Sequence, residues 1–491
     1  MTADIELALR FAFSQGSGKA AVVRRIDVDA APVSTYGRPV AGARTDRAAA
    51  LPTGTLDLLE ATPFPRVPLA GAAGDAGERL GRALTAAFGV QRREPSNAFN
   101  DHRGMPSVRS KFPVHAFVTG RGAPAVLDPY RHALLELGGL PEADQAPRIA
   151  LAGRYTNLPG FYQRLRGSLT DLETGIGLRA LCVGLEQLAL PYRLRLPGSP
   201  GAVTAADLGL APHEAWSTPV TVELGETSGV GRHAPSRPAD PPSDAYPAAA
   251  GDPTLAEIVA VNRAVLGLPP EVADAPGGAV AAAGAGTGHS WARVLWDRSS
   301  GRMPRNLSGM AGRRRPVAAA AIDDAVAWAR AEPPSALLRQ IGRSVTVTAC
   351  LQEVEGRADG VYRLADGALH PVALGAGVGA KLERHYGYPL STTNGCDVRH
   401  AAAVWFFSVP PGALLRAHGP AGWTLAQWWC GWAAQGLCTA AAAHGLYARP
   451  ARAFTEIPLQ RVLRLEPDAM LLFSVISGTA RFREPMLDLR I

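Results

Sequence analysis

Two arginines and two serines lie close together in the segment WDRSSGRMP, residues 296–304. Arg298 and Arg302 flank Ser299 and Ser300. A guanidinium group binds phosphate or carboxylate oxygens through two parallel hydrogen bonds, and a serine hydroxyl supplies a further donor. The segment is therefore a candidate site for a phosphate dianion. The alternative interpretation is a charged loop that faces solvent.

The elements that would position such a site belong to a large protein. At 491 residues the chain exceeds the size at which one hydrophobic core stops growing, so two domains are expected. Hydrophobic residues make up 47% and charged residues 19%, without a run of eighteen apolar residues, which is typical of a globular protein and not of a membrane or disordered one. The first residues lack the basic region of a secretory signal, so a cytoplasmic location is expected.

The net charge of +7 comes almost entirely from arginine, because the chain has only the lysines Lys19, Lys111 and Lys381. An acidic peptide or a phosphorylated cofactor would suit this charge. The arginines are scattered, and no helix-turn-helix, zinc finger or basic aromatic platform is recognisable, so a nucleic-acid partner is not expected. The five cysteines form no Cys-x-x-Cys pair, so neither a metal site nor a disulfide framework is expected.

A stretch rich in proline and alanine, residues 226–254, predicts a linker between an N-terminal half, 1–225, and a C-terminal half, 255–491. The halves repeat the same order of elements. Gly175 matches Gly431 in two apolar segments that predict buried helices, and each is followed by a loop and a β-rich strand.

Upstream of the matching helices, segments 105–120 and 333–349 both run from Pro-Ser through a basic loop into an alternating strand. The sequence therefore predicts an α+β fold made of two copies of one unit, related by a pseudo-twofold axis.

These features in this order resemble the FMN-dependent nitroreductase superfamily. The resemblance rests on the arginine–serine cluster, the Pro-Ser loop, GVYRLADGALHPV, and GWAAQGLCTAAAAHGL followed by RAFTEIPLQRVLRLEPDAMLLFSVISG. More narrowly, the chain resembles the SagB-type thiazoline and oxazoline dehydrogenases, which act on ribosomally made peptides such as thiopeptide antibiotics. The resemblance covers residues 80–225 and 291–485.

The resemblance implies two tandem three-layer units that form an intramolecular dimer around FMN. Family members are usually homodimers with two flavin sites at the interface. Residues 59–71, the counterpart of the arginine–serine cluster, contain only one arginine, so one site is expected to be lost. The resemblance implies these FMN contacts: the phosphate on Arg298, Ser299, Ser300, Arg302, Arg481 and Arg483; the cover from Pro106, Ser107 and Arg109; backbone groups of Arg452, Ala453 and Phe454 at the reactive nitrogen.

The thiazoline dehydrogenases also carry a Lys-Tyr pair, which here corresponds to Arg154 and Tyr155. Oxidation of an azoline to an azole removes a carbon-bound proton, so a base is needed. Arginine stays protonated and cannot take it. We expect Tyr155 to be the base, with its pKa lowered by Arg154 or by the flavin environment, and Lys111 is the alternative amine.

The resulting hypothesis is an FMN-dependent azoline dehydrogenase whose partners are a precursor peptide and the cyclodehydratase of the same pathway. Two alternatives remain: a flavin oxidoreductase that reduces a small molecule with NAD(P)H, and a peptide-binding scaffold without activity. The sequence lacks the glycine-rich, Walker, Gly-x-Ser-x-Gly and His-Glu-x-x-His motifs, so it offers no support for a dinucleotide-binding, ATPase, hydrolase or zinc-protease fold.

Overall fold

The computed structural model describes most of the chain. The described residues are 2–14, 39–72, 74–95, 101–211, 214–225, 252–269, 278–281, 287–301, 312–386, 397–481 and 486–491. Most of the predicted linker, together with Arg302 and Arg483, lies outside them.

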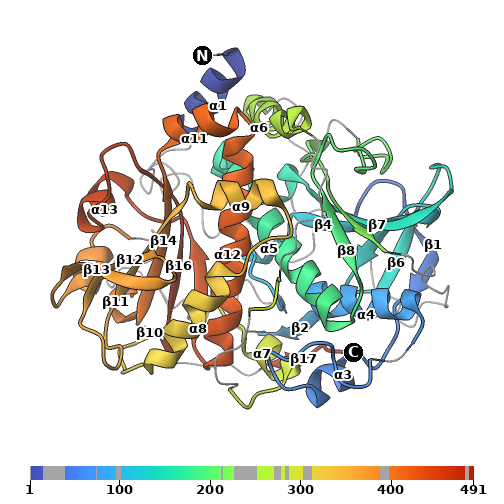
Figure 1. Ribbon diagram of the computed structural model, residues 1–491. Coiled ribbons are helices and arrows are strands. Elements are labelled where there is room, and N and C mark those ends of the chain that lie inside the picture. The colour runs from blue at the N-terminus through green and yellow to red at the C-terminus, as the bar shows by residue number, and fades with distance from the viewer. Residues whose placement is uncertain are drawn as a thin grey trace.

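Two antiparallel sheets form the two halves, one at each side of the molecule (Figure 1). The N-terminal sheet has the order β1-β6-β5-β4-β7-β9-β8, and the C-terminal sheet has the order β10-β16-β14-β11-β12-β13, with β15 also paired to β16. The strands of the first sheet are β1 (Ala43–Ala50), β4 (Val114–Gly122), β5 (Ala125–Asp128), β6 (Ala133–Leu137), β7 (Ala143–Gly153), β8 (Tyr192–Arg195) and β9 (Val220–Leu224). Those of the second are β10 (Gly312–Arg313), β11 (Thr346–Leu351), β12 (Gly360–Ala365), β13 (Ala368–Leu374), β14 (Ala403–Val409), β15 (Tyr447–Ala451) and β16 (Met470–Ala480).

The two sheets have the same connectivity. The order β6-β5-β4-β7-β9-β8 in the first half corresponds strand for strand to β13-β12-β11-β14-β16-β15 in the second. In both halves the long helix stands between the fourth and fifth strands of this unit in the chain. The prediction of two copies of one α+β unit is therefore confirmed, and β1 and β10 are additions to it.

Two long helices, α5 (Leu165–Gln187) and α12 (Gly422–Ala443), lie against each other between the sheets. Nearly every residue of both helices is buried, as expected for helices without a polar face. Helices α4 (Ala76–Phe88) and α8 (Ala319–Arg330) pack against α5 and α12, respectively. The core of the molecule is thus continuous from one half to the other.

The crossing of α5 and α12 is reciprocal. A methyl group on Gly175 would overlap the carbonyl oxygen of Trp428, and one on Gly431 would overlap the carbonyl oxygen of Leu172. Each of these carbonyl groups belongs to the residue three positions before the glycine of its own helix: Trp428 precedes Gly431, and Leu172 precedes Gly175. The matching glycines of the two sequence repeats therefore occupy equivalent places on either side of a pseudo-twofold axis.

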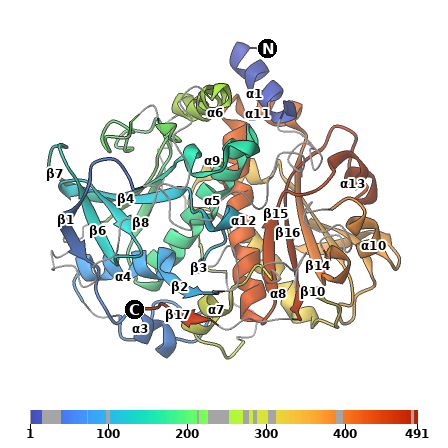
Figure 2. The same cartoon turned by 180° about the vertical axis from the view of Figure 1, so that it is seen from behind.

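A small third sheet links the halves a second time, because β17 (Leu487–Asp488), near the end of the chain, pairs with β2 (Val90–Arg93), which pairs with β3 (Asp101–Arg103). The view from behind shows this sheet close to α7 (Figure 2). The other helices are α1 (Ala3–Ser14), α3 (Thr55–Ala61), α6 (Pro253–Arg263), α7 (Trp291–Asp297), α9 (Ala336–Gly342), α10 (Val378–Glu383), α11 (Pro411–His418) and α13 (Glu456–Val462). Among the helices of the described residues, none has the length and apolar character needed to span a membrane.

Candidate functional site

Arg298 extends from the C-terminal half into the N-terminal half. It follows helix α7, whose first turn is capped by the Ser290 side chain, and only 4% of its surface is exposed. Its Nε donates a hydrogen bond of 3.1 Å to the carbonyl oxygen of Arg103 on β3. Its terminal nitrogens lie 3.4 Å from Ser300 Oγ and 3.5 Å from His102 Nδ1. Arg298, which was predicted to bind an anion, therefore lies where the two units meet.

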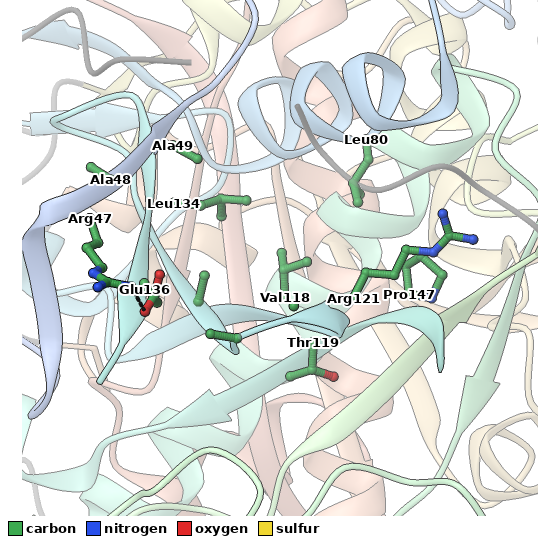
Figure 3. A pocket seen from close by; sticks show the side chains of 13 residues that line it. Arg47, Ala48, Ala49, Leu80, Val118, Thr119, Arg121, Leu134, Glu136 and Pro147 are labelled. Atoms are coloured by element: carbon green, nitrogen blue, oxygen red, sulfur yellow. Dashed lines mark hydrogen bonds and ion pairs between the residues drawn. The ribbon is translucent and has the colours of Figure 1, made fainter. Parts of the chain in front are cut away.

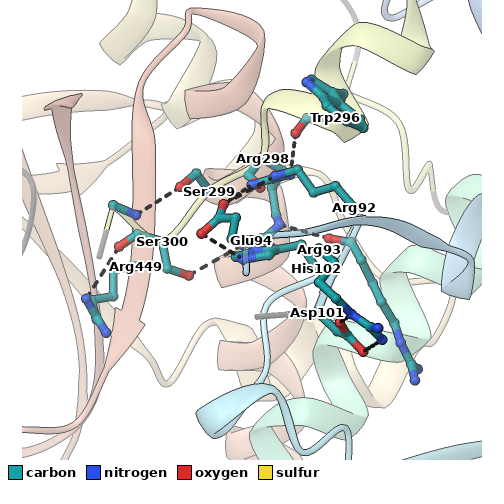
Figure 4. Close-up of polar contacts among 12 residues, drawn as sticks. Arg92, Arg93, Glu94, Asp101, His102, Trp296, Arg298, Ser299, Ser300 and Arg449 are labelled. Atoms are coloured by element: carbon teal, nitrogen blue, oxygen red, sulfur yellow. Dashed lines mark hydrogen bonds and ion pairs between the residues drawn. The ribbon is translucent and has the colours of Figure 1, made fainter. Parts of the chain in front are cut away.

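Two further arginines complete the cluster (Figure 4). Arg92 on β2 donates hydrogen bonds to the carbonyl oxygens of Trp296 and Arg298, the latter at 3.2 Å. Arg449 on β15 lies 3.5 Å from the carbonyl oxygen of Ser300. The N-terminal half thus contributes one guanidinium group and the C-terminal half contributes two.

The cluster carries an excess of positive charge among its described members. Burial, together with the charge of Arg92, lowers the pKa of Arg298 to about 10. Glu94 supplies one carboxylate, 3.3 Å from Arg92 and 3.2 Å from His102. Burial lowers the pKa of His102 to about 4, so this imidazole is neutral at pH 7. Of the two carboxylates at this place, Asp101 is paired with Arg93, so Glu94 alone stands against Arg92, Arg298 and Arg449. A bound anion would stabilise this largely buried arrangement.

A pocket beside the cluster brings predicted residues of both halves together. It is lined by Pro106, Ser107 and Arg109 from the first half and by Arg298, Ser299 and Ser300 from the second. Its volume is about 60 Å³. That volume is well below the roughly 300–1,000 Å³ of pockets that hold whole ligands, so this pocket could receive only a small group or one end of a larger ligand.

The Pro-Ser loop is held in an unusual conformation. Arg109, Ser110 and Phe112 have φ angles of 51°, 52° and 43°, in the left-handed region that non-glycine residues rarely adopt. The loop closes on itself through a 2.8 Å hydrogen bond from the Phe112 amide to Ser107 Oγ. Surrounding contacts must stabilise such a backbone, which keeps Pro106 and Ser107 at the pocket.

Glu173 supplies one of these contacts and was missed by the sequence analysis. It lies on α5, is 2% exposed, and accepts a 2.7 Å hydrogen bond from the Val108 amide. Burial raises the pKa of its carboxyl group to about 8. The available signal was a carboxylate in a segment that was predicted to be a buried helix, at the position where the second repeat has Trp429.

Lys111 belongs to the same loop. It stands between Ser110 and Phe112, which both line the pocket, and it is 3% exposed. Burial, and then the charge of Arg109, lower the pKa of its amine to about 8. A substantial fraction of the amine is therefore neutral near physiological pH.

The predicted effect of Arg154 on Tyr155 is wrong. Tyr155 is completely buried, and burial, followed by the neighbouring Asp171 carboxyl, raises its pKa well above 10. Arg154 instead pairs with Glu214 and packs 5.5 Å from the centre of the Trp216 ring. The two consecutive side chains therefore lie in different surroundings, Arg154 beside Glu214 and Tyr155 in the hydrophobic core. Tyr155 is not among the residues that line the pocket.

The predicted residues near the C-terminus lie outside this pocket. Arg452 and Ala453 belong to the connection between β15 and α13, and Phe454 packs against Tyr386 with ring centres 5.7 Å apart. Arg481 donates a 2.9 Å hydrogen bond to the Gly312 carbonyl and forms a 2.8 Å ion pair with Asp397. None of these four residues lines the pocket.

Comparison with known proteins gives no matching family model and no matching curated protein. Among solved structures, a protein described as a putative nitroreductase from Anabaena variabilis aligns with a TM-score of 0.66 and 15% identity, over 97% of this chain and 99% of its own. Two further structures match only part of the chain. The E. coli microcin synthetase McbBCD complex with truncated pro-MccB17 bound aligns with a TM-score of 0.30 and 18% identity, over 37% of this chain and 70% of its own. A putative nitroreductase from Ralstonia eutropha aligns with a TM-score of 0.27 and 20% identity, over 39% of this chain and 95% of its own. The alignment over nearly all of both chains shows that this protein has a nitroreductase fold.

Proposed function

We propose that the protein is an FMN-dependent oxidoreductase with one flavin site between its two halves. Its proposed reaction is the oxidation of thiazolines or oxazolines in a ribosomally made peptide to thiazoles or oxazoles. The observation that carries the cofactor assignment is the buried cluster of three arginines, contributed by both halves, beside a small pocket.

The residues of this cluster fit the phosphate end of FMN. Arg298 and Arg449 would hold the phosphate oxygens with their guanidinium groups, and the hydroxyls of Ser299 and Ser300 would add donors. The Gly301 amide already donates to Ser299 Oγ at 3.1 Å, which fixes the turn. When bound, FMN would supply the acceptor for two electrons that the oxidation of an azoline requires.

The place in the first half that corresponds to the arginine–serine cluster is filled by other side chains, which favours a single flavin site. In the first half, the segment after α3 takes the place in chain order that the arginine–serine cluster takes after α7. Its Phe64 packs against Trp291 and Trp328, with ring centres 4.7 Å and 5.4 Å away. Arg179, at the position that Gln435 occupies in α12, is fully buried and donates to the carbonyl oxygens of Ala279 and Trp432. Aromatic packing and a buried arginine that already donates to two carbonyl oxygens fill this position, and the one arginine of the segment, Arg66, is exposed.

The chain's own part in the reaction would be to take the ring proton. Lys111 is the better candidate, because its amine has a pKa of about 8, whereas burial raises the pKa of Tyr155. The neutral amine would accept the proton above this pKa.

Substitution of Lys111 by methionine is therefore expected to lower kcat by about 100-fold or more while FMN remains bound. In the unchanged protein, kcat/KM should rise with pH and level off above about 8, since only the deprotonated amine is a base. The variant should lose this rise. Steady-state rates from pH 6 to 10 measure both effects. A variant that keeps the rise with pH would show that another group takes the proton.

The proposed function is tested with purified protein and a peptide that contains a thiazoline. We expect flavin absorbance bands and, without added nicotinamide, a loss of two hydrogens per ring by mass spectrometry. In the pathway, a cyclodehydratase would supply the azoline. Oxidation of NAD(P)H without any change in the peptide would favour a small-molecule reductase instead. Protein that neither contains nor takes up FMN would favour a binding scaffold.

A further inference from the structure

A second pocket lies in the N-terminal half and shares no lining residue with the arginine cluster (Figure 3). It is formed by β1, β4, β5, β6, β7 and α4, and its volume of about 480 Å³ is within the usual range for ligand pockets. Leu80, Val118 and Leu134, with several alanines, form an apolar middle part. Arg47 and Arg121 lie on opposite sides of it.

An irregularity in β1 places Arg47 at this pocket. Arg44 pairs with Glu136 and Ala48 with Leu135, so three residues of β1 are inserted between adjacent positions of β6. Arg47 is one of the three. Its side chain remains 55% exposed and lies 3.5 Å from Glu136. A bulge of this kind turns a side chain out of the regular ladder, and bulges are frequent next to functional sites.

A second irregularity places Arg121 at the other side. Thr119 pairs with Arg148 and Arg121 with Asp144, so β7 carries extra residues opposite Gly120. Gly120 has a φ of 100°, and a methyl group there would overlap the carbonyl oxygen of Ala146. Only glycine fits this position without strain. The exposed Arg121 follows directly, beside Pro147 at the pocket wall.

The duplication does not account for either feature. In the second half β11 corresponds to β4 and β14 to β7, but this pair ends at Leu351, the counterpart of Thr119, so it has no paired segment that corresponds to the irregular end of β4. Among the described strands, β13 is the last at the edge that corresponds to β1. The two irregularities thus lie in paired strand segments that have no counterpart among the described strands of the second half, and each places one arginine at the same pocket.

These features point to a peptide with negative charges. A guanidinium group binds a carboxylate with a matched pair of hydrogen bonds, and the apolar middle part suits a hydrophobic side chain. Strand β1 is at the edge of its sheet and can pair with an added strand through its main chain. We propose that this pocket binds an extended peptide segment in which carboxylates flank an apolar side chain, and that the segment is the part of the substrate remote from the oxidised ring. The assignment of this segment to the substrate rests on the proposed function.

The binding test uses a fluorescein-labelled peptide of alternating leucine and glutamate, followed by fluorescence anisotropy. We expect the unchanged protein to bind it, and Arg121→Glu and Arg47→Glu each to weaken binding by about tenfold or more, because each reverses a charge at the pocket. Arg416→Glu, an exposed arginine on α11 in the other half, is the matched control and should bind normally. A peptide with lysine in place of glutamate should not bind. No binding by the unchanged protein, or binding by the two pocket variants as tight as that of the unchanged protein, would overturn the proposal.

The same variants separate this proposal from the proposed function. Arg121→Glu should keep its FMN and oxidise a short thiazoline peptide normally, but should lose the lower KM that an added acidic segment gives the unchanged protein. If the unchanged protein binds the labelled peptide but oxidises no azoline, the peptide-binding role of the pocket stands and the proposed function is refuted. Equal KM values with and without the acidic segment in the unchanged protein would refute the link to the substrate.

Discussion

The Arg298→Ala variant is expected to bind FMN on the order of 100-fold more weakly than the unchanged protein. A hydrogen bond to a charged group contributes about 1.5–3 kcal/mol, and about 2.7 kcal/mol corresponds to 100-fold in affinity. Arg298 is 4% exposed and joins the two halves at the cluster, so water cannot readily replace its guanidinium group. Titration of the FMN-free protein, followed by flavin fluorescence, measures the change.

The control for this experiment is Arg481→Ala. The sequence analysis assigned both arginines to the phosphate, but the structure pairs Arg481 with Asp397 and Gly312. We therefore expect this variant to bind FMN within about twofold of the unchanged protein. Since Arg298 also donates to the Arg103 carbonyl, thermal unfolding without FMN must show that the Arg298 variant is folded. Normal affinity in a folded Arg298→Ala protein would rule out the cluster as the phosphate site.

The duplicated fold was accessible from the sequence because both repeats keep local signals. A helix that is apolar on all sides is recognisable without knowledge of its neighbours, and Gly175 and Gly431 mark the same turn in both. The structure confirms this match through the common strand order and the reciprocal contact of the glycines. By contrast, strand β1 has no counterpart in the second sheet, so comparison of the two repeats could not predict it.

The site was only partly accessible, because half of it depends on distant pairing. Arg92 and His102 lie on the short strands β2 and β3, whose position is fixed by pairing with each other and with β17 at the end of the chain. Arg449 is placed by the pairing of β15 with β16. No local pattern shows that these residues meet Arg298.

Tyr155 illustrates why adjacency in sequence was misleading. Arg154, or the flavin environment, was expected to lower the pKa of Tyr155. Arg154 has an extended backbone, with φ of −99° and ψ of 104°, and Tyr155 begins a short 3₁₀ turn. Successive side chains in extended backbone point to opposite sides, so the arginine reaches Glu214 while the tyrosine enters the core.

The second large effect is expected at the crossing of the central helices. Gly431→Ala should lower the free energy of unfolding by about 3 kcal/mol, the upper part of the range for overpacking a core. The added methyl group would strike the Leu172 carbonyl, which is helical backbone and cannot rotate away as a side chain could. Gly175→Ala should have a similar effect, because its methyl group would strike the equivalent carbonyl of Trp428. Urea unfolding followed by circular dichroism measures the loss.

Gly177→Ala is the matched control, two residues along the same helix from Gly175. Its methyl group would find the side chains of Phe88, Val114 and Leu151 at 3.7–3.9 Å, which is ordinary contact. Since alanine favours a helix over glycine by about 1 kcal/mol, this variant should be as stable as the unchanged protein or more so. If Gly431→Ala were equally stable, α5 and α12 would not cross as closely as described. The proposed flavin site would be affected as well, because it lies where the two halves meet and Arg298 of one half donates to β3 of the other.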